Sequence, residues 1–391
     1  MNAAVDVKGW CPGALRPMPS GDGLIVRIRP SCGALSLEQA DVLAELARSL
    51  GNGHIDLTRR ANLQLRGLSE ERLPELHHEL GRLALLDGDA ATEARRNIMV
   101  SPLAGLDRAE SFDVRPIAAA LDRALVSDKF LQALPAKFGF IVDGGGPLSI
   151  SGERADIALV ATGETMAFGL DTPSGMAWLG SLAPDRAIAV ALVAARAFVA
   201  GAGAGRMRDD VSRVEPVVRP LLRPLHAEPT TGSRRLGLLP TAVGIAAPFG
   251  RLEAAQLHRV VRLGRQAGAA DLRLSPWRSF YIGVRDATLL EGARSAGLIV
   301  DEHEPLLRIE ACPGAPACRA STVDTRGDAR RLAALAQAWS GRIHVSGCAK
   351  KCACSDRTDL TLIGEAGRYR VGQRLVDPID LDSFIDMPVH G

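Results

Sequence analysis

The stretch GALSLEQADVLAELARSLGNGHIDLTRRANLQLRGL at residues 33–68 decides the fold, because the chain carries its pattern twice. Residues 250–285, GRLEAAQLHRVVRLGRQAGAADLRLSPWRSFYIGVR, repeat the pattern without a gap. Apolar positions coincide through both copies, as in Leu35 with Leu252 and Ile55 with Leu272. A repeat of this length indicates one supersecondary unit that has been duplicated.

Each copy is predicted to be a strand–helix–strand unit. In the first copy, apolar residues recur at helical spacing over residues 36–50, and Gly51 supplies a stop signal. Residues 23–29, 54–58 and 62–66 alternate between apolar and polar side chains, as half-buried strands do. Two such copies are what a ferredoxin-like sheet requires.

A second, weaker duplication lies outside the first. FIVDG at residues 140–144 matches IHVSG at 343–347, and RADIAL at 154–159 matches RTDLTL at 357–362 in the same order. Residues 206–240 hold five prolines and are predicted to be an extended linker between the halves. We therefore expect an α+β, pseudo-twofold fold in five parts: small modules at 15–90 and 241–298, larger modules at 91–205 and 299–391, and the linker.

Composition narrows the function classes. The 391 residues carry 47 Lys and Arg against 45 Asp and Glu, and this balance argues against a dedicated nucleic-acid binder. No apolar run has the length of a membrane span, and the start lacks the apolar core of a signal peptide. We expect a cytoplasmic protein without membrane or nucleic-acid partners, whose seven cysteines are not a disulfide framework.

The cysteines give the sharpest chemical signal. Cys312 and Cys318 enclose PGAPA, and Cys348 and Cys352 enclose AKK. Four thiolates in two short clusters can converge on one soft metal centre. Structural zinc is the alternative, but its paired cysteines are usually about 2–4 residues apart, and the first loop is longer. The spacing therefore favours an iron–sulfur cluster over zinc or unpaired thiols.

Arginines collect in the first half, at the ends of apolar segments. Arg27 and Arg29 alternate on one strand, Thr58-Arg59-Arg60 follows another, and Arg95-Arg96-Asn97 precedes a third. Solvated loop charges are the ordinary explanation for any single arginine, but three clusters together indicate an anion-binding face. The second copy replaces Thr58-Arg59-Arg60 by Ser275-Pro276-Trp277 and has lost that face. The glycines at 144–146 lack the Lys-Ser/Thr ending of a phosphate loop, and the glycine-rich segment 201–205 follows a helical stretch instead of a strand, so neither fits a nucleotide site.

These motifs resemble the nitrite and sulfite reductase family over nearly the whole chain from about residue 15. TRRANLQ at 58–64 is similar to the family's Thr-x-Arg-Gln-x-x-Gln strand, with Ala61 in place of the glutamine. RNIM at 96–99 with SPLAG at 101–105 resembles its tetrapyrrole-contacting turn, and LPAKF at 134–138 resembles its Leu-Pro-Arg-Lys-Phe segment. The start, WCPGALRPM at residues 10–18, resembles the cobalamin-pathway branch in particular.

The resemblance implies the cofactors and the site. It implies a [4Fe–4S] cluster on Cys312, Cys318, Cys348 and Cys352, and a possible second iron, either non-haem iron or sirohaem. By position it carries over a set of catalytic residues, Arg29, Arg60, Arg96 and Lys137, and a set of cofactor-binding residues, Thr58, Arg60, Asn62, Gln64, Arg96 and Asn97. Ala136 and Gly139 stand where the reductases carry basic side chains, so we expect a pocket with less positive charge.

The implied activity is that of a monooxygenase that acts on a modified tetrapyrrole. Precorrin-3A would be hydroxylated by O2 with lactone formation, and the electrons would come from an external reductase or ferredoxin and ultimately from NAD(P)H. Two alternatives remain open at this point: sirohaem-dependent reduction of sulfite or nitrite, and a carrier of the cluster or the tetrapyrrole without turnover.

Overall fold

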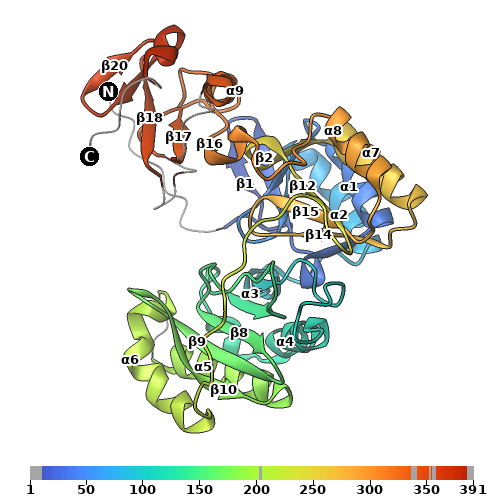
Figure 1. The fold of residues 1–391 in the computed structure, drawn as a ribbon, viewed down its shortest axis with the longest axis vertical. Helices are drawn as coiled ribbons and strands as arrows, with labels where there is room; N and C mark the ends of the chain where they lie inside the picture. Colours follow the sequence, from blue (N-terminus) through green and yellow to red (C-terminus); the bar gives the residue numbers. More distant parts are fainter. Residues whose placement is uncertain (1–10, 202–204, 336–340, 352–353, 355–357, 385–391) are drawn as a thin grey trace.

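A computed structural model describes residues 11–201, 205–335, 341–351, 354 and 358–384 of the chain, apart from the side chains of 382–384. Four five-stranded sheets form three regions (Figure 1). Two of the sheets, coloured blue and yellow-orange, lie side by side, the green module lies to one side of them, and the red module lies to another. None of the helices in the described ranges is long and apolar enough to cross a bilayer.

The two ferredoxin-like sheets have the same topology. Their strand orders are β1-β2-β5-β4-β13 and β11-β12-β15-β14-β3, and within both sheets all neighbours are antiparallel. The elements of the first half are β1 (Met18–Ser20), β2 (Gly23–Ile28), β3 (Ala34–Ser36), α1 (Leu37–Ser49), β4 (His54–Leu57) and β5 (Leu63–Leu68). Those of the second are β11 (Gly237–Leu238), β12 (Val243–Ala246), β13 (Arg251–Glu253), α7 (Ala254–Gln266), β14 (Asp271–Leu274) and β15 (Ser279–Ile282). The predicted strand–helix–strand repeat is confirmed.

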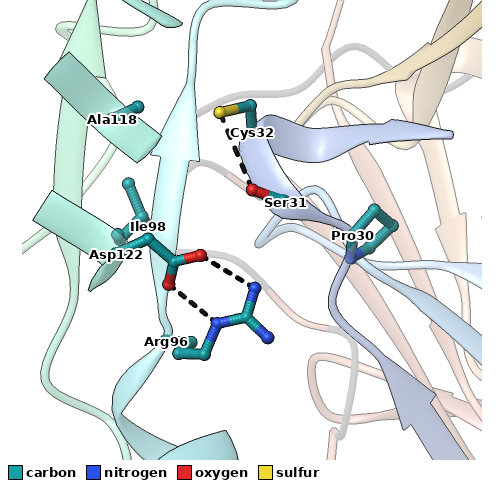
Figure 2. A pocket seen from close by; sticks show the side chains of 7 residues that line it. All are labelled: Pro30, Ser31, Cys32, Arg96, Ile98, Ala118 and Asp122. Carbon is teal, nitrogen blue, oxygen red and sulfur yellow. Dashed lines mark hydrogen bonds and ion pairs between the residues drawn. The ribbon is translucent and has the colours of Figure 1, made fainter. Parts of the chain in front are cut away.

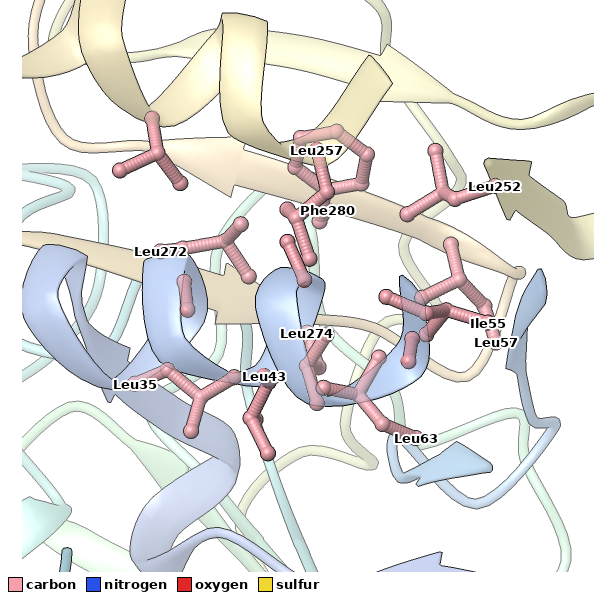
Figure 3. Packing of buried hydrophobic residues seen from close by; sticks show 14 of the residues in the cluster. Leu35, Leu43, Ile55, Leu57, Leu63, Leu252, Leu257, Leu272, Leu274 and Phe280 are labelled. Carbon is pink, nitrogen blue, oxygen red and sulfur yellow. The ribbon is translucent and has the colours of Figure 1, made fainter. Parts of the chain in front are cut away.

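The halves exchange their short strands. In register, β3 of the first half places Leu35 opposite Leu272 of β14, and β13 of the second half places Leu252 opposite Ile55 of β4. Helices α1 and α7 pack on one another, and all four of these apolar side chains belong to one buried core (Figure 3). Neither half can therefore complete its sheet without the other.

Helix α1 begins at Leu37, one residue after the predicted start, and Ser36 is its N-cap. The Ser36 side chain accepts a hydrogen bond from the Gln39 backbone N–H, and the Gln39 side chain accepts one from the Ser36 N–H. This capping box satisfies two of the backbone donors that a helix N-terminus leaves unpaired. Helices α2 (Leu73–Arg82) and α3 (Ala90–Arg95) then lead into the first larger module.

The two larger modules also share a topology. Both sheets have two parallel pairings followed by two antiparallel ones, in the orders β6-β7-β8-β9-β10 and β16-β17-β18-β19-β20. The first module contains β6 (Ile98–Val100), α4 (Arg115–Ser127), β7 (Phe140–Asp143), β8 (Ile157–Thr162), β9 (Thr165–Thr172), β10 (Gly175–Leu182), α5 (Ala187–Ala200) and α6 (Met207–Val218). The second contains β16 (Ile309–Ala311), α9 (Thr325–Leu335), β17 (Ile343–Ser346), β18 (Leu360–Glu365), β19 (Arg368–Val371) and β20 (Arg374–Val376), and α8 (Ala287–Ser295) precedes it. The weaker duplication is confirmed.

The predicted linker at 206–240 is wrong over its first third. Residues Met207–Val218 form helix α6, which packs on α5 and β9 and buries Met207, Val214 and Val218. Pro216 lies inside this helix, and further prolines follow it. The high proline content of the segment therefore masked the helical spacing of its apolar residues. The error matters because Arg206, at the start of α6, lies in the candidate site described below.

Candidate functional site

The cysteine loops begin where two neighbouring parallel strands end. Strand β16 ends at Ala311, one residue before Cys312, and β17 ends at Ser346, two residues before Cys348. Ala311 is paired with Val345, so both loops leave the same edge of the sheet. The Gly347 N–H donates to the Cys312 Sγ over 3.1 Å, which ties the two loops together.

The other cysteines are placed in part. Cys318 closes its loop with a backbone hydrogen bond from its N–H to the Gly314 carbonyl, 2.7 Å long. Cys352 lies outside the described residues, which contain no cluster of three or more His, Cys, Asp or Glu side chains able to hold a metal. Convergence of all four thiols stays a prediction.

The first module shows what this loop edge is like without a metal ligand. Its β6 and β7 match β16 and β17, and there the Gly144 N–H donates to the Ser101 Oγ over 3.1 Å. Ser101 thus occupies in the first module the place that Cys312 has in the second. A thiol that already accepts a backbone N–H is suited to be an iron–sulfur ligand, because such hydrogen bonds stabilise the thiolate. The donor set at this edge therefore fits the cluster.

Two of the four predicted catalytic residues are neutralised inside the protein. Arg29 is 6% exposed and lies 2.7 Å from the Glu93 carboxylate. Arg96 donates to Asp87 over 2.6 Å and makes a two-bond contact with Asp122. Burial alone would lower the pKa of Arg96, but the carboxylate of Asp122, with that of Asp87, raises it above its ordinary value.

Arg96 and Asp122 also line a small pocket (Figure 2). The pocket has a volume of about 10 Å³, and its walls include Cys32 and Ile98. Ligand sites are usually about 300–1,000 Å³, so this pocket is too small for a macrocycle. Arg96 therefore holds α4 to the sheet, and Arg60 is the better candidate for direct contact with an anion.

Arg60 is the predicted residue that keeps binding capacity. It is half-buried, and its Nη1 has no hydrogen-bond partner. Burial and the nearby charge of Arg206 lower the pKa of Arg60, and Asp156 opposes them. Arg206 is ion-paired with Asp156, so the unpaired Arg60 nitrogen is the group that would stabilise an added carboxylate here.

Gly139 makes room for Arg60, and the expectation of a pocket with less positive charge stays a prediction. A Cβ at position 139 would lie 2.6 Å from the Arg60 Nη1, so the absent side chain leaves the space that the Arg60 guanidinium fills. Asp156, which is fully buried, accepts the Gly139 N–H and also two bonds from the start of α6, from Arg206 Nε and Met207 N. Asp156 thus ties the Gly139 backbone to the start of α6 beside Arg60.

The remaining predicted residues mostly hold the backbone. The Thr58 Oγ1 accepts the N–H groups of Arg60 and Asn62 and so fixes the turn that presents Arg60, and Asn62 is buried in that turn. The Asn97 Nδ2 donates to three backbone carbonyls, those of Ala94, Ala136 and Phe138. Gln64 accepts from Arg27 once its amide is oriented correctly, and Lys137 is exposed.

The N-terminal segment closes over the arginines. The Glu93 carboxylate accepts the N–H groups of Ala14 and Leu15, and the Arg29 Nη2 donates to the Pro12 carbonyl. Cys11 lies close enough to Arg27 to raise its pKa, against the lowering that burial causes. These contacts are not readable from the sequence, because Glu93 lies outside the arginine motif and Arg206 lies in the segment predicted to be a linker.

Comparisons with known proteins agree with this architecture. The family model of the nitrite/sulfite reductase ferredoxin-like half domain matches residues 16–83, and that of the nitrite and sulphite reductase 4Fe-4S domain matches residues 91–218. The second match covers the first larger module, which contains no cysteine; the cysteine loops lie in its duplicate. The structure of Mycobacterium tuberculosis NirA protein superposes with a TM-score of 0.75 at 20% identity and covers 93% of this chain and 79% of that one.

The fold and the matched domains define a class: the chain belongs to the nitrite/sulfite reductase family of oxidoreductases. Within that family, a precorrin-3B synthase from Sinorhizobium sp. is 33% identical over 388 residues, which cover 93% of this chain and 82% of the relative. A ferredoxin–nitrite reductase from Synechococcus elongatus is 26% identical and covers 94% of this chain and 80% of the relative. The predicted resemblance, including its cobalamin-pathway branch, is confirmed.

Proposed function

We propose that this protein is a precorrin-3B synthase, which oxygenates precorrin-3A with O2 and forms a lactone. The observation that carries the proposal is the higher identity to the precorrin-3B synthase than to the nitrite reductase, 33% against 26% at similar coverage. The N-terminal segment supports it, because the motif that resembles this branch closes directly over Arg27 and Arg29.

The roles of the chain's own residues follow from the site. Arg60 would bind a carboxylate arm of the macrocycle, since precorrin-3A carries several acetate and propionate groups. Arg206, paired with Asp156, would hold the wall beside it. The walls of the macrocycle pocket would be held in place by five residues, Arg29, Arg96, Thr58, Asn62 and Asn97. Gln64 would orient Arg27. Lys137, exposed on its loop, would contact the substrate only at the rim.

Cys312, Cys318, Cys348 and Cys352 would hold a [4Fe–4S] cluster, which supplies single electrons when bound. The oxygenation needs two electrons: one oxygen atom enters the product and the other leaves as water. No described part of the chain has a dinucleotide-binding fold, so these electrons would come from an external reductase or ferredoxin, and ultimately from NAD(P)H. Whether a second iron is non-haem iron or sirohaem would be read from the optical spectrum.

Labelled dioxygen tests the proposal. Incubation of the purified protein with precorrin-3A, a reductant and 18O2 should give a product with one labelled oxygen atom, and turnover should stop without air. An unlabelled product, or rapid anaerobic reduction of sulfite or nitrite, would contradict the proposal in favour of the reductase. Precorrin binding without O2 consumption would indicate a carrier.

A further inference from the structure

The two larger modules differ on one face of their sheets. In the first module, Met99 of β6 is paired with Ile141 of β7, and both are buried in an apolar cluster. In the second module, the same register position holds Glu310 of β16 paired with His344 of β17. The fold itself is satisfied by the apolar pair, so the polar pair needs another explanation.

His344 is buried without satisfying its polar atoms. Its side chain is 0% exposed, and neither ring nitrogen has a hydrogen-bond partner. Unpaired buried polar atoms are rare in native proteins, because each loses its hydrogen bonds to water without replacement. Burial also lowers the pKa of His344, which keeps the ring neutral, with one N–H to donate.

The surroundings of His344 are cationic. The Arg278 side chain lies against Gly250, in the turn Pro248–Gly250 that contacts β16, the strand beside His344. Arg59, Arg278 and Lys351 all act on the charge of His344, and Glu310 is the acidic group among them. Glu310 is already engaged, because it forms an ion pair with Arg59. The cluster of groups therefore carries more positive than negative charge.

Of the three cations, Arg59 is ion-paired and Lys351 is exposed, whereas Arg278 is half-buried and uncommitted. Within the described part of the chain it makes no hydrogen bond or ion pair, and burial together with Arg59 lowers its pKa. It lies on the turn between β14 and β15 with a left-handed backbone, φ 56°, as does Ala61 at the equivalent turn of the first half, φ 51°. Arg278 thus presents a guanidinium at the position where Ala61 of the first half has a methyl group.

We propose that Arg278 and His344 form a carboxylate-binding subsite, which takes an acidic arm of the tetrapyrrole on the side of the cysteine-bearing module. A carboxylate would accept two bonds from the guanidinium fork and one from the imidazole N–H, and it would balance the excess positive charge. Lys351, on the Cys348 loop, adds positive electrostatic potential at the subsite. The subsite rests on the proposed function and deepens it, because it gives the macrocycle contacts from the second half of the chain.

Binding of uroporphyrin, a porphyrin with eight carboxylates, tests the subsite by fluorescence quenching of the cluster-loaded protein. Arg278→Gln and His344→Ile should each raise Kd at least fivefold. The second variant introduces the residue that the first module has at this position, Ile141. Arg262→Gln, an exposed arginine on α7, removes the same charge and should leave Kd within twofold. Melting temperature and iron content report folding, and if His344→Ile fails to fold, Arg278→Gln decides.

The outcomes separate the subsite from the proposed function. If Arg278→Gln and folded His344→Ile both bind like the unaltered protein while Arg60→Gln binds weakly, the subsite is wrong and the first-half pocket stands. If Arg60→Gln also binds like the unaltered protein, the macrocycle pocket is wrong as well. If Arg278→Gln and Arg262→Gln lose the same amount of affinity for uroporphyrin, the loss is a general effect of charge, and the subsite is wrong.

Discussion

Glu93 satisfies three buried donors at once, two from the N-terminal backbone and one from Arg29. The pair is almost wholly removed from water, with side-chain exposures of 4% for Arg29 and 5% for Glu93. A buried ion pair contributes little net stability while it is intact, but removal of one partner leaves the other charge uncompensated. Residues of this kind fix the shape of a site without touching its ligand.

Glu93→Gln should therefore be strongly destabilising. We expect a loss of about 3–5 kcal/mol in the free energy of unfolding, the range measured when one partner of a buried pair is removed. Urea denaturation followed by circular dichroism measures it. Glu45→Gln, which breaks an exposed pair with Arg48, is the control and should leave the midpoint unchanged. Equal midpoints for both variants would show that the Arg29 pair is not buried in solution.

Glu110 should make stability depend on pH. Burial raises its pKa from 4.5 to about 8, although Ser101 and the Gly105 N–H oppose the shift. The folded protein then holds a proton that the unfolded chain releases, so stability should fall as pH rises from 4.5 to about 8 and level off above.

Melting temperatures across this range check the sign. Glu110→Gln resembles the protonated acid, so its melting temperature should decline less with pH than that of the unaltered protein. Glu164→Gln, on the exposed turn between β8 and β9, should keep the original slope. Identical slopes for all three proteins would mean that Glu110 titrates normally.

At the scale of the residue, sequence motifs located the arginine-rich region but not the partners that determine each role. Arg29, Arg60 and Arg96 look equivalent in the sequence, yet only Arg60 keeps a guanidinium nitrogen without a partner. Asp87, Asp122 and Glu93, which neutralise the other two, are separated from them by up to 64 residues. Pairing over such separations depends on the tertiary fold, which no local pattern encodes.

At the scale of the element, the exchanged strands link the two halves. Leu35 of β3 and Leu252 of β13 hold equivalent places in opposite sheets, with exposures of 0% and 1%. The helical and strand periods of the repeat were readable because each unit has one buried face. The exchange itself was not readable, because a three-residue strand has no pattern of its own.

Leu35→Ala and Leu252→Ala should destabilise the protein alike. Each leaves a cavity in the shared core, and a Leu→Ala change at such a site costs about 2–5 kcal/mol. We expect one cooperative unfolding transition for each variant, because the halves share a core. Calorimetry tests this: two separated transitions in either variant would show that the halves unfold independently. Leu375→Ala, at an exposed position on β20, is the control and should change little.

At the scale of the whole molecule, the duplication has produced two unequal modules. Their sheets have the same topology, but the loop edge carries Ser101 and Gly144 in one and Cys312 and Gly347 in the other. The cysteine spacing was visible in the sequence because it is local, and the strand order then explains why the two loops meet. The same comparison explains why a domain named for its cluster can match the module without cysteines.

The ligand set follows from this asymmetry and can be tested residue by residue. Replacement of Cys312, Cys318, Cys348 or Cys352 by Ala should each remove most of the iron and acid-labile sulfide from the anaerobically purified protein, because a [4Fe–4S] cluster needs four protein ligands. Cys354→Ala should retain both. Cys32 is the second control: it lies in the turn before β3 and packs on the first module, so Cys32→Ala should also keep the cluster.

The variant Ser101→Cys tests whether a thiol at this loop edge is enough to bind iron or whether the paired cysteines are needed. It places a thiol at the equivalent edge of the first module, where the Gly144 N–H already points at the side chain. That edge has no counterpart of Cys348, because Gly145 stands at the equivalent position. The variant should therefore gain no iron. A second cluster in Ser101→Cys, or a full cluster in Cys348→Ala, would contradict the assignment, since the metal site would then depend on the loop edge and not on the paired cysteines.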